Sequence, residues 1–485
     1  MLTLALLPPI NDWVYIVVYT IYAITILGTI VIIITENRNP VKSLAWVLVL
    51  AFLPIVGLVF YIFFGQNFKA KRMVSRRIKR KLRKRDYHSI VNIDSLPLNE
   101  ESKQEIRLCH SLCSVPYYSG SHVKIFTSGE DKFKHYLQDL EIAQEYIHIQ
   151  YYIFEDDKLG NRVKEVLLRC ARRGIQIRIL YDDVGCWSVK KRFFKEMQDA
   201  GIAVRPFLEI TFPQLASRIN YRNHRKITVI DGKVGFIGGI NISDEYINKK
   251  ERFGHWKDTG LMFKGPGVEN LTIMFLEMWN AFEEKEGGYR DFVPAEYEEK
   301  GGEGDGYILS FSDSPLDDEN ASENVYADIL YNANDYVYIT TPYLAIDSSL
   351  QNALCLAAKR GVDVRLITPG IPDKKMVYRL TRSYYASLIR AGVKIYEYTP
   401  GFVHAKSYVA DDKIGVVGTI NMDYRSLYLH FECGTLMYDS PAVIDLRNDD
   451  LATIEKCRKI ELSDCRTSFF GELIDRVLRV IAPLL

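Results

Sequence analysis

The sequence of 485 residues predicts an α/β protein made of two duplicated domains with mostly parallel sheets, preceded by a two-helix transmembrane hairpin. Three observations predict this architecture: two uncharged apolar tracts near the start of the chain, an order of strands and helices that occurs twice, and a histidine motif in each copy. The length exceeds that of one ordinary domain and fits two domains with additional segments.

The hairpin is predicted over residues 1–68, with spans at about 13–35 and 43–65, where no charged residue occurs. About 20 apolar residues suffice to cross a bilayer, so each tract favours a membrane span over a buried helix of a soluble core. A signal peptide is disfavoured, because no basic stretch precedes the first tract and no small-residue cleavage pattern follows it.

A basic tract follows the second span. Eleven Lys and Arg and no acidic residue occur between Lys69 and Arg85, so the formal net charge of +1 hides a chain that is otherwise net acidic. Lys and Arg beside a span are retained in the cytoplasm, which predicts a multi-pass cell-membrane protein with cytoplasmic domains. The juxtamembrane linker 69–105 is also expected to contact an anionic membrane surface. No nucleic-acid partner is predicted, since the tract abuts a span and lacks interleaved aromatic residues.

The duplication covers the rest of the chain. The two copies are predicted at 106–293 and 307–485, separated by the polar, glycine-rich linker 294–306. In each copy a strand-like run, at 145–154 or 335–344, leads into a helical stretch and then into a second β-branched strand. Such alternation is typical of α/β units with a mostly parallel sheet.

The end of the chain is amphipathic. Six apolar residues have the spacing of one helix face, and they are Phe470, Leu473, Ile474, Val477, Leu478 and Ile481. We expect this helix to pack on the body, with a position on the membrane surface as the alternative.

The eight cysteines are scattered and contain no CxxC pair, which predicts reduced thiols. Cys109, His110 and Cys113 form the one cluster, and they lack the additional ligands of a structural zinc site. No metal is predicted there.

Each copy contains HxKxxxxD followed by a glycine turn and an asparagine: HRKITVID with GGIN, then HAKSYVAD with GTIN. The candidate residues are His224, Lys226, Asp231 and Asn241 in the first copy and His404, Lys406, Asp411 and Asn421 in the second. Residues i and i+2 of a strand project to one face, so each histidine shares a space with its lysine. Each aspartate lies at odd spacing, in a turn, and is expected to be structural.

The two motifs are expected to meet. If the copies pack about a pseudo-twofold axis, one cleft receives two histidines and two lysines, which makes an anion site with acid and base capacity. A metal site is not predicted, because a lysine beside each histidine repels a cation. One such motif can arise by chance, whereas two at equivalent places of a duplicated unit are specific.

These residues resemble the phospholipase D superfamily, and the resemblance covers essentially everything after the basic tract. It implies a two-step reaction without a metal or other cofactor, in which one histidine attacks a phosphodiester phosphorus and the other protonates the leaving alcohol. It further implies that the phosphate oxygens are held by four side chains, Lys226, Lys406, Asn241 and Asn421.

The resemblance also implies an acidic side chain downstream of each motif that orients the histidine ring. Glu432 is assigned to His404, and Asp258 to His224 with Glu251 as its competitor. The amino-terminal histidine, His224, is expected to be the nucleophile, because that motif more often carries the covalent intermediate in the superfamily. Thr419 stands where many relatives have serine, which keeps a hydroxyl at this position.

Within the superfamily, the hairpin and the segments 371–392 and 421–432 are similar to bacterial cardiolipin synthases. This resemblance implies that two phosphatidylglycerol molecules give cardiolipin and glycerol through a phosphohistidine. The alternatives are a phospholipase D hydrolase or another phosphatidyltransferase, such as one that uses phosphatidylethanolamine. A nuclease and a non-enzymatic lipid-binding protein belong to other classes, and two intact motifs argue against lost catalysis. The sequence leaves the oligomeric state open.

Overall fold

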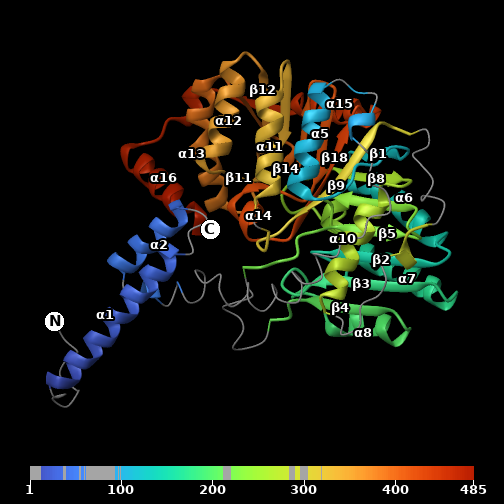
Figure 1. Ribbon diagram of the computed structural model, residues 1–485, viewed down its shortest axis with the longest axis horizontal. Coiled ribbons are helices and arrows are strands. Elements are labelled where there is room, and N and C mark those ends of the chain that lie inside the picture. Colours follow the sequence, from blue (N-terminus) through green and yellow to red (C-terminus); the bar gives the residue numbers. More distant parts are fainter. Residues whose placement is uncertain are drawn as a thin grey trace.

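The computed structural model describes residues 12–35, 40–53, 56–58, 61, 93–96, 98, 100–210, 220–282, 290–294, 304–317 and 319–484. The basic tract 69–85 and the greater part of the linker 294–306 lie outside these residues, so both remain predictions, as do the domain boundaries. Figure 1 shows two α/β repeats side by side and a helical hairpin that projects from one of them.

The first repeat is built on a seven-stranded sheet. Its strands are β1 (His122–Phe126), β2 (Tyr146–Tyr151), β3 (Gln176–Asp182), β4 (Ala203–Phe207), β5 (Ile227–Ile230), β6 (Val234–Gly238) and β8 (Gly260–Lys264). Its helices are α6 (Gly129–Glu141), α7 (Lys158–Arg172), α8 (Lys191–Asp199) and α10 (Val268–Asn280). Short elements are η3 (Asp244–Ile247), β7 (His255–Lys257) and η4 (Arg290–Phe292).

The second repeat is built on an eight-stranded sheet. Its strands are β9 (Tyr307–Asp313), β10 (Tyr336–Thr340), β12 (Asp363–Pro369), β13 (Lys394–Tyr398), β15 (Ser407–Ala410), β16 (Ile414–Gly418), β18 (Glu432–Tyr438) and β19 (Cys457–Ile460). Its helices are α11 (Ala321–Asn332), α12 (Ser348–Lys359), α13 (Lys375–Ala391), α15 (Pro441–Ile454) and α16 (Phe469–Ile481). Short elements are β11 (Leu344–Ala345), β14 (Gly401–Val403), β17 (Met422–Asp423), α14 (Tyr424–Tyr428), η6 (Leu462–Cys465) and η7 (Ala482–Leu484).

The two sheets have the same strand order. It runs β1-β8-β6-β5-β2-β3-β4 in the first and β9-β18-β16-β15-β10-β12-β13 in the second, with β19 added at the edge. Equivalent helices even begin alike: the Asp157 side chain accepts a hydrogen bond from the Gly160 N–H at the start of α7, and Asp347 accepts one from Leu350 at the start of α12. The predicted duplication is confirmed.

The sheets are mixed, so the prediction of mostly parallel sheets is wrong. Within these two sheets only β2-β3-β4 and β10-β12-β13 pair in parallel, and β5, β6 and β8 and their counterparts β15, β16 and β18 pair antiparallel. The reason is local. Helical crossovers join only the first strands of each repeat, whereas a tight turn after Asp231 or Asp411 joins the next two, and a short turn permits only an antiparallel pair.

The core has three layers of apolar packing. One cluster lies between the first sheet and α6, α7 and α8, and a second lies between the other sheet and α11, α12 and α13. A third is shared, because apolar residues of both sheets meet α10 and α15 between the repeats. Helix α5 (Glu100–Cys113), which follows the turn η2 (Ile93–Ser95), packs on the second repeat through Ile106 and Cys109. The repeats are thus joined by a common core.

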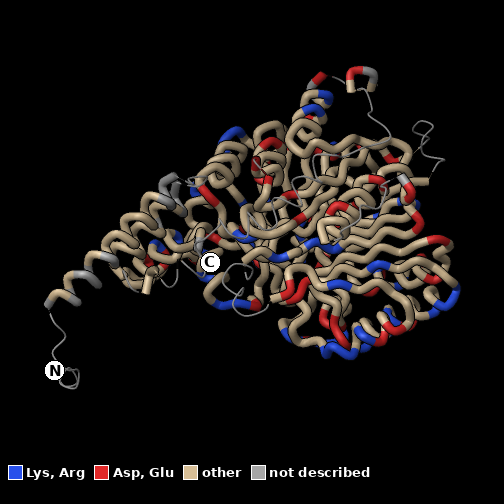
Figure 2. Tube along the Cα trace, turned by 60° about the horizontal axis from the view of Figure 1, so that its bottom comes forward, with Lys and Arg blue, Asp and Glu red and all other residues tan. Residues whose placement is uncertain are grey.

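The hairpin consists of α1 (Asp12–Thr35) and α2 (Pro40–Phe52), which pack against each other near Trp46 and Leu50. Charged residues are sparse along it and frequent over the body (Figure 2). Within the described ranges, no helix combines the length and the apolar character that a membrane crossing requires. The predicted transmembrane hairpin is therefore unconfirmed.

Candidate active site

The two motifs occupy equivalent places in the middle of the two sheets. His224 and Lys226 lie in the extended segment that leads into β5, and His404 and Lys406 lie in the one that leads into β15. Both histidines and both motif asparagines, Asn241 and Asn421, line one cavity of about 480 Å³. The expectation of one common cleft is met for the two histidines, whereas Lys226 and Lys406 are not among the residues that line the cavity.

Each histidine is held by an acid of the other repeat. His224 Nδ1 lies 3.0 Å from both carboxylate oxygens of Glu432, and His404 Nδ1 lies 2.7 Å from Oδ2 of Asp258. The sequence-based pairing of Glu432 with His404 and of Asp258 with His224 is wrong. The two acids were chosen correctly, but their partners are exchanged.

Backbone pairing across the interface produces this exchange. The N–H of His224 donates to the carbonyl of Phe431 at 2.9 Å, and the N–H of His404 donates to that of Lys257 at 2.6 Å. Each of these carbonyls belongs to the residue just before the acid. In addition, β7 and β14 pair in parallel across the two repeats. The interface that joins the repeats therefore also places each acid under the opposite histidine.

The surroundings of each histidine and its acid determine the protonation states of both groups. Burial lowers the pKa of His224 to about 3 and that of His404 to about 4. Burial opposes ionisation of Glu432 and Asp258, but contact with the histidines outweighs it and their pKa values lie below the ordinary ones. At pH 7 both rings are therefore neutral and both acids ionised. Because each Nδ1 faces a carboxylate it carries the ring proton, which leaves Nε2 as a free base.

The motif lysines are buried with the histidines, at 0% exposure for Lys226 and 2% for Lys406. The ammonium group of each donates to the carbonyl of its own histidine, at 2.6 Å for Lys226. Burial lowers the pKa of Lys226 to about 7 and that of Lys406 to about 8. The pKa values of the two lysines therefore lie close to neutral pH. An anion that binds beside them favours their charged form.

Asp231 and Asp411 are structural, as expected from their spacing. The Asp231 carboxylate accepts three backbone N–H bonds of 2.8 Å at the start of β2, from residues 144–146. Asp411 accepts three bonds of 2.7–3.0 Å at the start of β10, from residues 334–336. Both aspartates have a φ of 52° in the turn that follows the motif strand. They fasten this turn to the neighbouring strand and touch no reacting group.

The asparagines differ in their partners. Asn241 accepts from the N–H of Ile153 at 3.1 Å and donates to Tyr246 at 2.6 Å, whereas the buried side-chain oxygen of Asn421 has no hydrogen-bond partner among the described residues. Both face the cavity. The cavity wall contains further aromatic and basic side chains that sequence reasoning missed: Tyr152, Tyr246, Trp256, Tyr343, Phe402, Tyr424, Arg252, Lys374 and Arg425.

Thr419 and His430 complete the surroundings of Glu432. The Thr419 hydroxyl donates to the Glu432 carboxylate, and His430 Nδ1 lies 3.5 Å from it. Glu251, the competing acid, is exposed and makes no such contact. His430 was missed because it lies in the bend between α14 and β18, two residues before Glu432, where strand spacing gives no signal.

One group of side chains has ligand atoms close enough for a metal within the described part of the chain. It consists of His224, His430 and Glu432, whose ligand atoms lie within 4.8 Å of one another. In this group Glu432 already accepts from His224 and Thr419, and the buried Lys226 is close enough to lower the pKa of His224. These donors suit a carboxylate that orients a histidine better than a cation site. The prediction of no metal stays a prediction.

Comparison with known proteins finds family models that match both repeats and the hairpin region. The family model "Cardiolipin synthase, PLD-like domain" matches residues 136–259 and 326–449, and "Phospholipase_D-nuclease N-terminal" matches 23–66. An uncharacterised protein of Streptococcus mutans is 39% identical over 464 residues, which cover 95% of this chain and 100% of that protein. A cardiolipin synthase of Alkalihalophilus pseudofirmus is 36% identical over 487 residues, or 98% of this chain and 95% of that one.

A solved structure has the same architecture. The phosphatidylserine synthase of Haemophilus influenzae has a TM-score of 0.58 at 12% identity and covers 79% of this chain and 100% of its own. At this identity the likeness concerns the fold alone.

Proposed function

This chain belongs to the cardiolipin synthase family of the phospholipase D superfamily, and from that premise we propose that it is a phosphatidyltransferase that converts two phosphatidylglycerol molecules into cardiolipin and glycerol. The observation that carries the proposal is the pair of complete half-sites, each with a histidine that lines one common cavity, a buried lysine and an acid behind the histidine. A site with one degenerate half would not support both a nucleophile and an acid.

In the first step, Nε2 of His224 attacks the phosphorus of one phosphatidylglycerol. Binding of the phosphate anion favours a charged His404, which takes up a proton at Nε2 from solvent. The P–N bond forms as the bond to the glycerol oxygen breaks, and His404 Nε2 delivers that proton to the leaving oxygen. Glycerol leaves and a phosphatidyl-histidine remains. In the second step, His404 takes the proton from the glycerol hydroxyl of another phosphatidylglycerol, whose oxygen attacks the phosphorus and releases His224. Lys226, Lys406 and the two motif asparagines hold the non-bridging oxygens, where charge is concentrated in the transition state.

The surroundings of the two rings support these roles for the histidines. Each acid accepts one further hydrogen bond, Glu432 from the Thr419 hydroxyl and Asp258 from the N–H of Thr259, so these donors do not separate the two halves. Burial lowers the pKa of His224 further than that of His404, to about 3 against about 4, so His404 is protonated more readily. His404 is then the better general acid, and His224 the neutral nucleophile.

Anchoring in the cell membrane belongs to the same proposal. We propose that α1 and α2, with residues up to 68, enter the bilayer, while both repeats lie in the cytoplasm. The support is the apolar surface of the hairpin, on which Trp13, Leu27 and Phe52 are 74%, 63% and 79% exposed, together with the adjoining basic tract. Thiol labelling from outside intact cells should reach a cysteine at position 39 and miss one at position 87. The opposite pattern would reverse the orientation.

The activity is tested with the purified full chain and phosphatidylglycerol vesicles, with lipid analysis and a glycerol assay. We expect cardiolipin and one glycerol per cardiolipin, in the presence of chelator and without a nucleotide-activated donor. The His224→Ala/His404→Ala chain is the matched control. Phosphatidic acid as the main product would instead favour a hydrolase, product formed only with added phosphatidylethanolamine would favour the other transferase, and a strict need for a divalent ion or for CDP-diacylglycerol would refute the proposed chemistry.

A further inference from the structure

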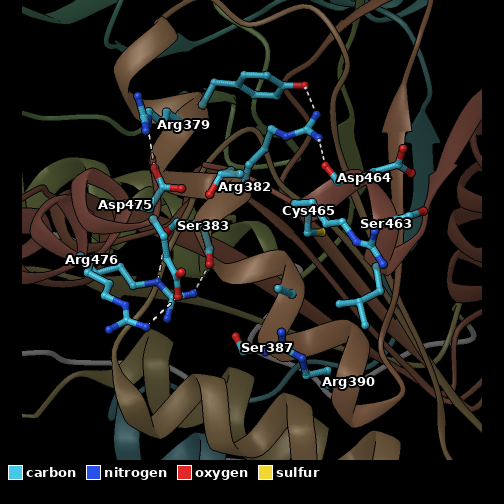
Figure 3. A pocket seen from close by; sticks show the side chains of 17 residues that line it. Arg379, Arg382, Ser383, Ser387, Arg390, Ser463, Asp464, Cys465, Asp475 and Arg476 are labelled. Atoms are coloured by element: carbon cyan, nitrogen blue, oxygen red, sulfur yellow. Dashed lines mark hydrogen bonds and ion pairs between the residues drawn. The ribbon is translucent and has the colours of Figure 1, made fainter. Parts of the chain in front are cut away.

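A second cavity, of about 860 Å³, lies on the second repeat between α13, η6 and α16. It shares no residue with the cavity of the two histidines. Helix α13 separates the two, because Met376, Val377 and Leu380 face the catalytic cavity while Arg379 and Arg382 face this one. Figure 3 shows its basic and hydroxyl side chains around a common space.

The lining has an excess of positive charge. It contains six arginines, Arg379, Arg382, Arg390, Arg466, Arg476 and Arg479, against three acids, Asp464, Glu472 and Asp475. We call this the arginine pocket. A surplus of guanidinium groups on one concave wall is suited to an anion, and above all to a phosphate, which matches their fork of donors.

The pairing of these arginines leaves donors for a ligand. Arg379 is paired with Asp475 at 2.7 Å and Arg382 with Glu397 at 2.9 Å. Arg476 is paired with Glu472 at 2.6 Å, but both side chains are more than half exposed, so this ion pair is weak. Arg390 and Arg466 make no hydrogen bond or ion pair to any described residue. Among the described residues nothing accepts from these two guanidinium groups, so their donors are open to solvent or to a ligand.

Helix α16, one wall of the pocket, is also apolar on its outer face. Six large side chains on it are 47–77% exposed, and they are Phe469, Phe470, Leu473, Ile474, Val477 and Val480. Only Leu478 of this helix is buried. The expectation that the apolar face packs on the body is met only for Leu478 and Ile481, because the other four predicted residues of that face are exposed. A helix with an arginine-rich edge and an exposed apolar face has the pattern of helices that lie in a membrane surface.

The position of α16 indicates the occupant. Both α16 and η7 lie against α2, at the point where the hairpin leaves the body (Figure 1). Leu44, Leu48 and Phe52 of α2 are exposed as well. The apolar surfaces of α16 and of the hairpin therefore adjoin, and the arginine pocket opens beside them.

We propose that the arginine pocket binds the phosphate group of an anionic phospholipid of the membrane, whose acyl chains lie along the apolar face of α16. The ligand is bound and not transformed, so this site goes beyond the proposed catalytic function. Arg390 and Arg466 contact the phosphate, and the bound lipid holds the second repeat against the bilayer. This contact between α16 and the bilayer does not depend on whether the hairpin spans the membrane.

The test measures lipid binding to the detergent-purified full chain by native mass spectrometry, with phosphatidylinositol as the anionic probe and phosphatidylcholine as the neutral one. Wild-type protein should bind phosphatidylinositol with a component that R390Q/R466Q weakens by about tenfold or more, since two basic side chains near an anionic lipid are lost. The matched control is R172Q/R192Q, two exposed arginines of the first repeat, which should bind like wild type. Cardiolipin formation from phosphatidylglycerol in detergent micelles should persist in every variant, which shows that each is folded.

Three results would refute the proposal: equal phosphatidylinositol affinity in R390Q/R466Q and wild type, equal binding of phosphatidylcholine, or occupation by inorganic phosphate at millimolar concentration with no preference for the lipid. The last result would identify a site for soluble anions. A second variant, F470S/V477S, should lower lipid affinity while leaving the arginines in place. If it has no effect, the acyl chains do not lie on α16.

Discussion

The two catalytic half-sites share one plan and differ around the acid. In both, a neutral histidine faces a carboxylate of the other repeat and a buried lysine donates to that histidine's carbonyl. The acid is Asp258 in one and Glu432 in the other, and the residue two positions before the motif asparagine is Gly239 in the first repeat and Thr419 in the second. The difference between the halves is thus a matched pair of changes.

Space explains why the changes go together. A Cβ on Gly239 would stand 2.2 Å from Oδ1 of Asp258, so the half-site with the aspartate requires glycine. In the other half the carboxylate is placed so that the Thr419 hydroxyl donates to it. The comparison teaches that two copies of one motif have become unequal, in accord with the different duties of nucleophile and acid that we propose for them.

The largest effect is expected from substitution of the two histidines. His224→Ala and His404→Ala should each lower turnover of phosphatidylglycerol by at least about 10⁴-fold, because nucleophile and proton donor are both required. On a phosphatidyl ester of p-nitrophenol, whose leaving group needs no proton, His404→Ala should still form the covalent enzyme and His224→Ala should not. Intact-protein mass after a quench in denaturant at neutral pH, which preserves the acid-labile P–N bond, measures it. A label trapped on residue 404 would reverse the roles.

The exchanged acids are tested next. Asp258→Asn and Glu432→Gln should each cost about 10²- to 10⁴-fold, since the histidine then loses its tautomer and orientation. With the activated ester, Asp258→Asn should behave like His404→Ala and Glu432→Gln like His224→Ala. Glu251→Gln is the control and should stay active. If instead each acid variant mimics the histidine of its own repeat, the exchanged pairing does not operate in catalysis.

The pH dependence sharpens the comparison at the lysines. Burial lowers the pKa of Lys226 to about 7 and that of Lys406 to about 8, and only the ammonium form holds phosphate oxygens. The specificity constant kcat/KM should therefore fall as pH rises from 7 to 9. Above the pKa of each lysine, deprotonation of that lysine should lower kcat/KM by up to about tenfold per pH unit. The fall in kcat should begin at higher pH, because bound phosphate favours the charged form. A kcat/KM that stays flat to pH 9 would contradict this account.

The aspartates should be equivalent in the two halves. Asp231→Ala and Asp411→Ala each leave three backbone N–H groups without their acceptor, which should lower the free energy of unfolding by about 1–3 kcal/mol. Denaturant unfolding in detergent measures it, with the Asp→Asn variants as milder controls. The specific activity of the folded protein should change little. A loss like that of a histidine variant would give these aspartates a chemical duty.

Thr419 should give the smallest effect. Thr419→Val removes one hydroxyl donor from Glu432 and should cost about 1 kcal/mol, or about fivefold in kcat/KM. Thr419→Ser keeps the donor and should match wild type in the same steady-state assay. A Thr419→Val loss as large as that of Glu432→Gln would make the hydroxyl essential for the position of the acid.

Much of the site followed from the sequence, because motif spacing encodes local geometry. His224, Lys226 and their counterparts were found from a two-residue period, and the structural duty of Asp231 and Asp411 from an odd one. The partners of Glu432 and Asp258 could not be found in this way. They depend on how two sheets pack about a pseudo-twofold axis, and distance along the chain carries no information on that.

The error about sheet type has a similar origin. Helical crossovers after β2 and β3 were evident in the pattern, and they suggested parallel pairing for the whole sheet. The turns at Asp231 and Asp411 are also evident in the sequence, and turns this short permit only antiparallel pairing of the strands that they join. Exposure of the α16 apolar face was missed because a periodic stripe predicts a covered face without identifying what covers it.

Because each histidine is oriented by an acid of the other repeat, the site can become active only late in the synthesis of the chain. Glu432 emerges from the ribosome 208 residues after His224, the ring it orients. Until then the histidine of the first repeat has no carboxylate to fix its tautomer. A growing or truncated chain that reaches lipid early therefore has no oriented histidine at position 224, and the reaction starts only once the second repeat has been made and docked.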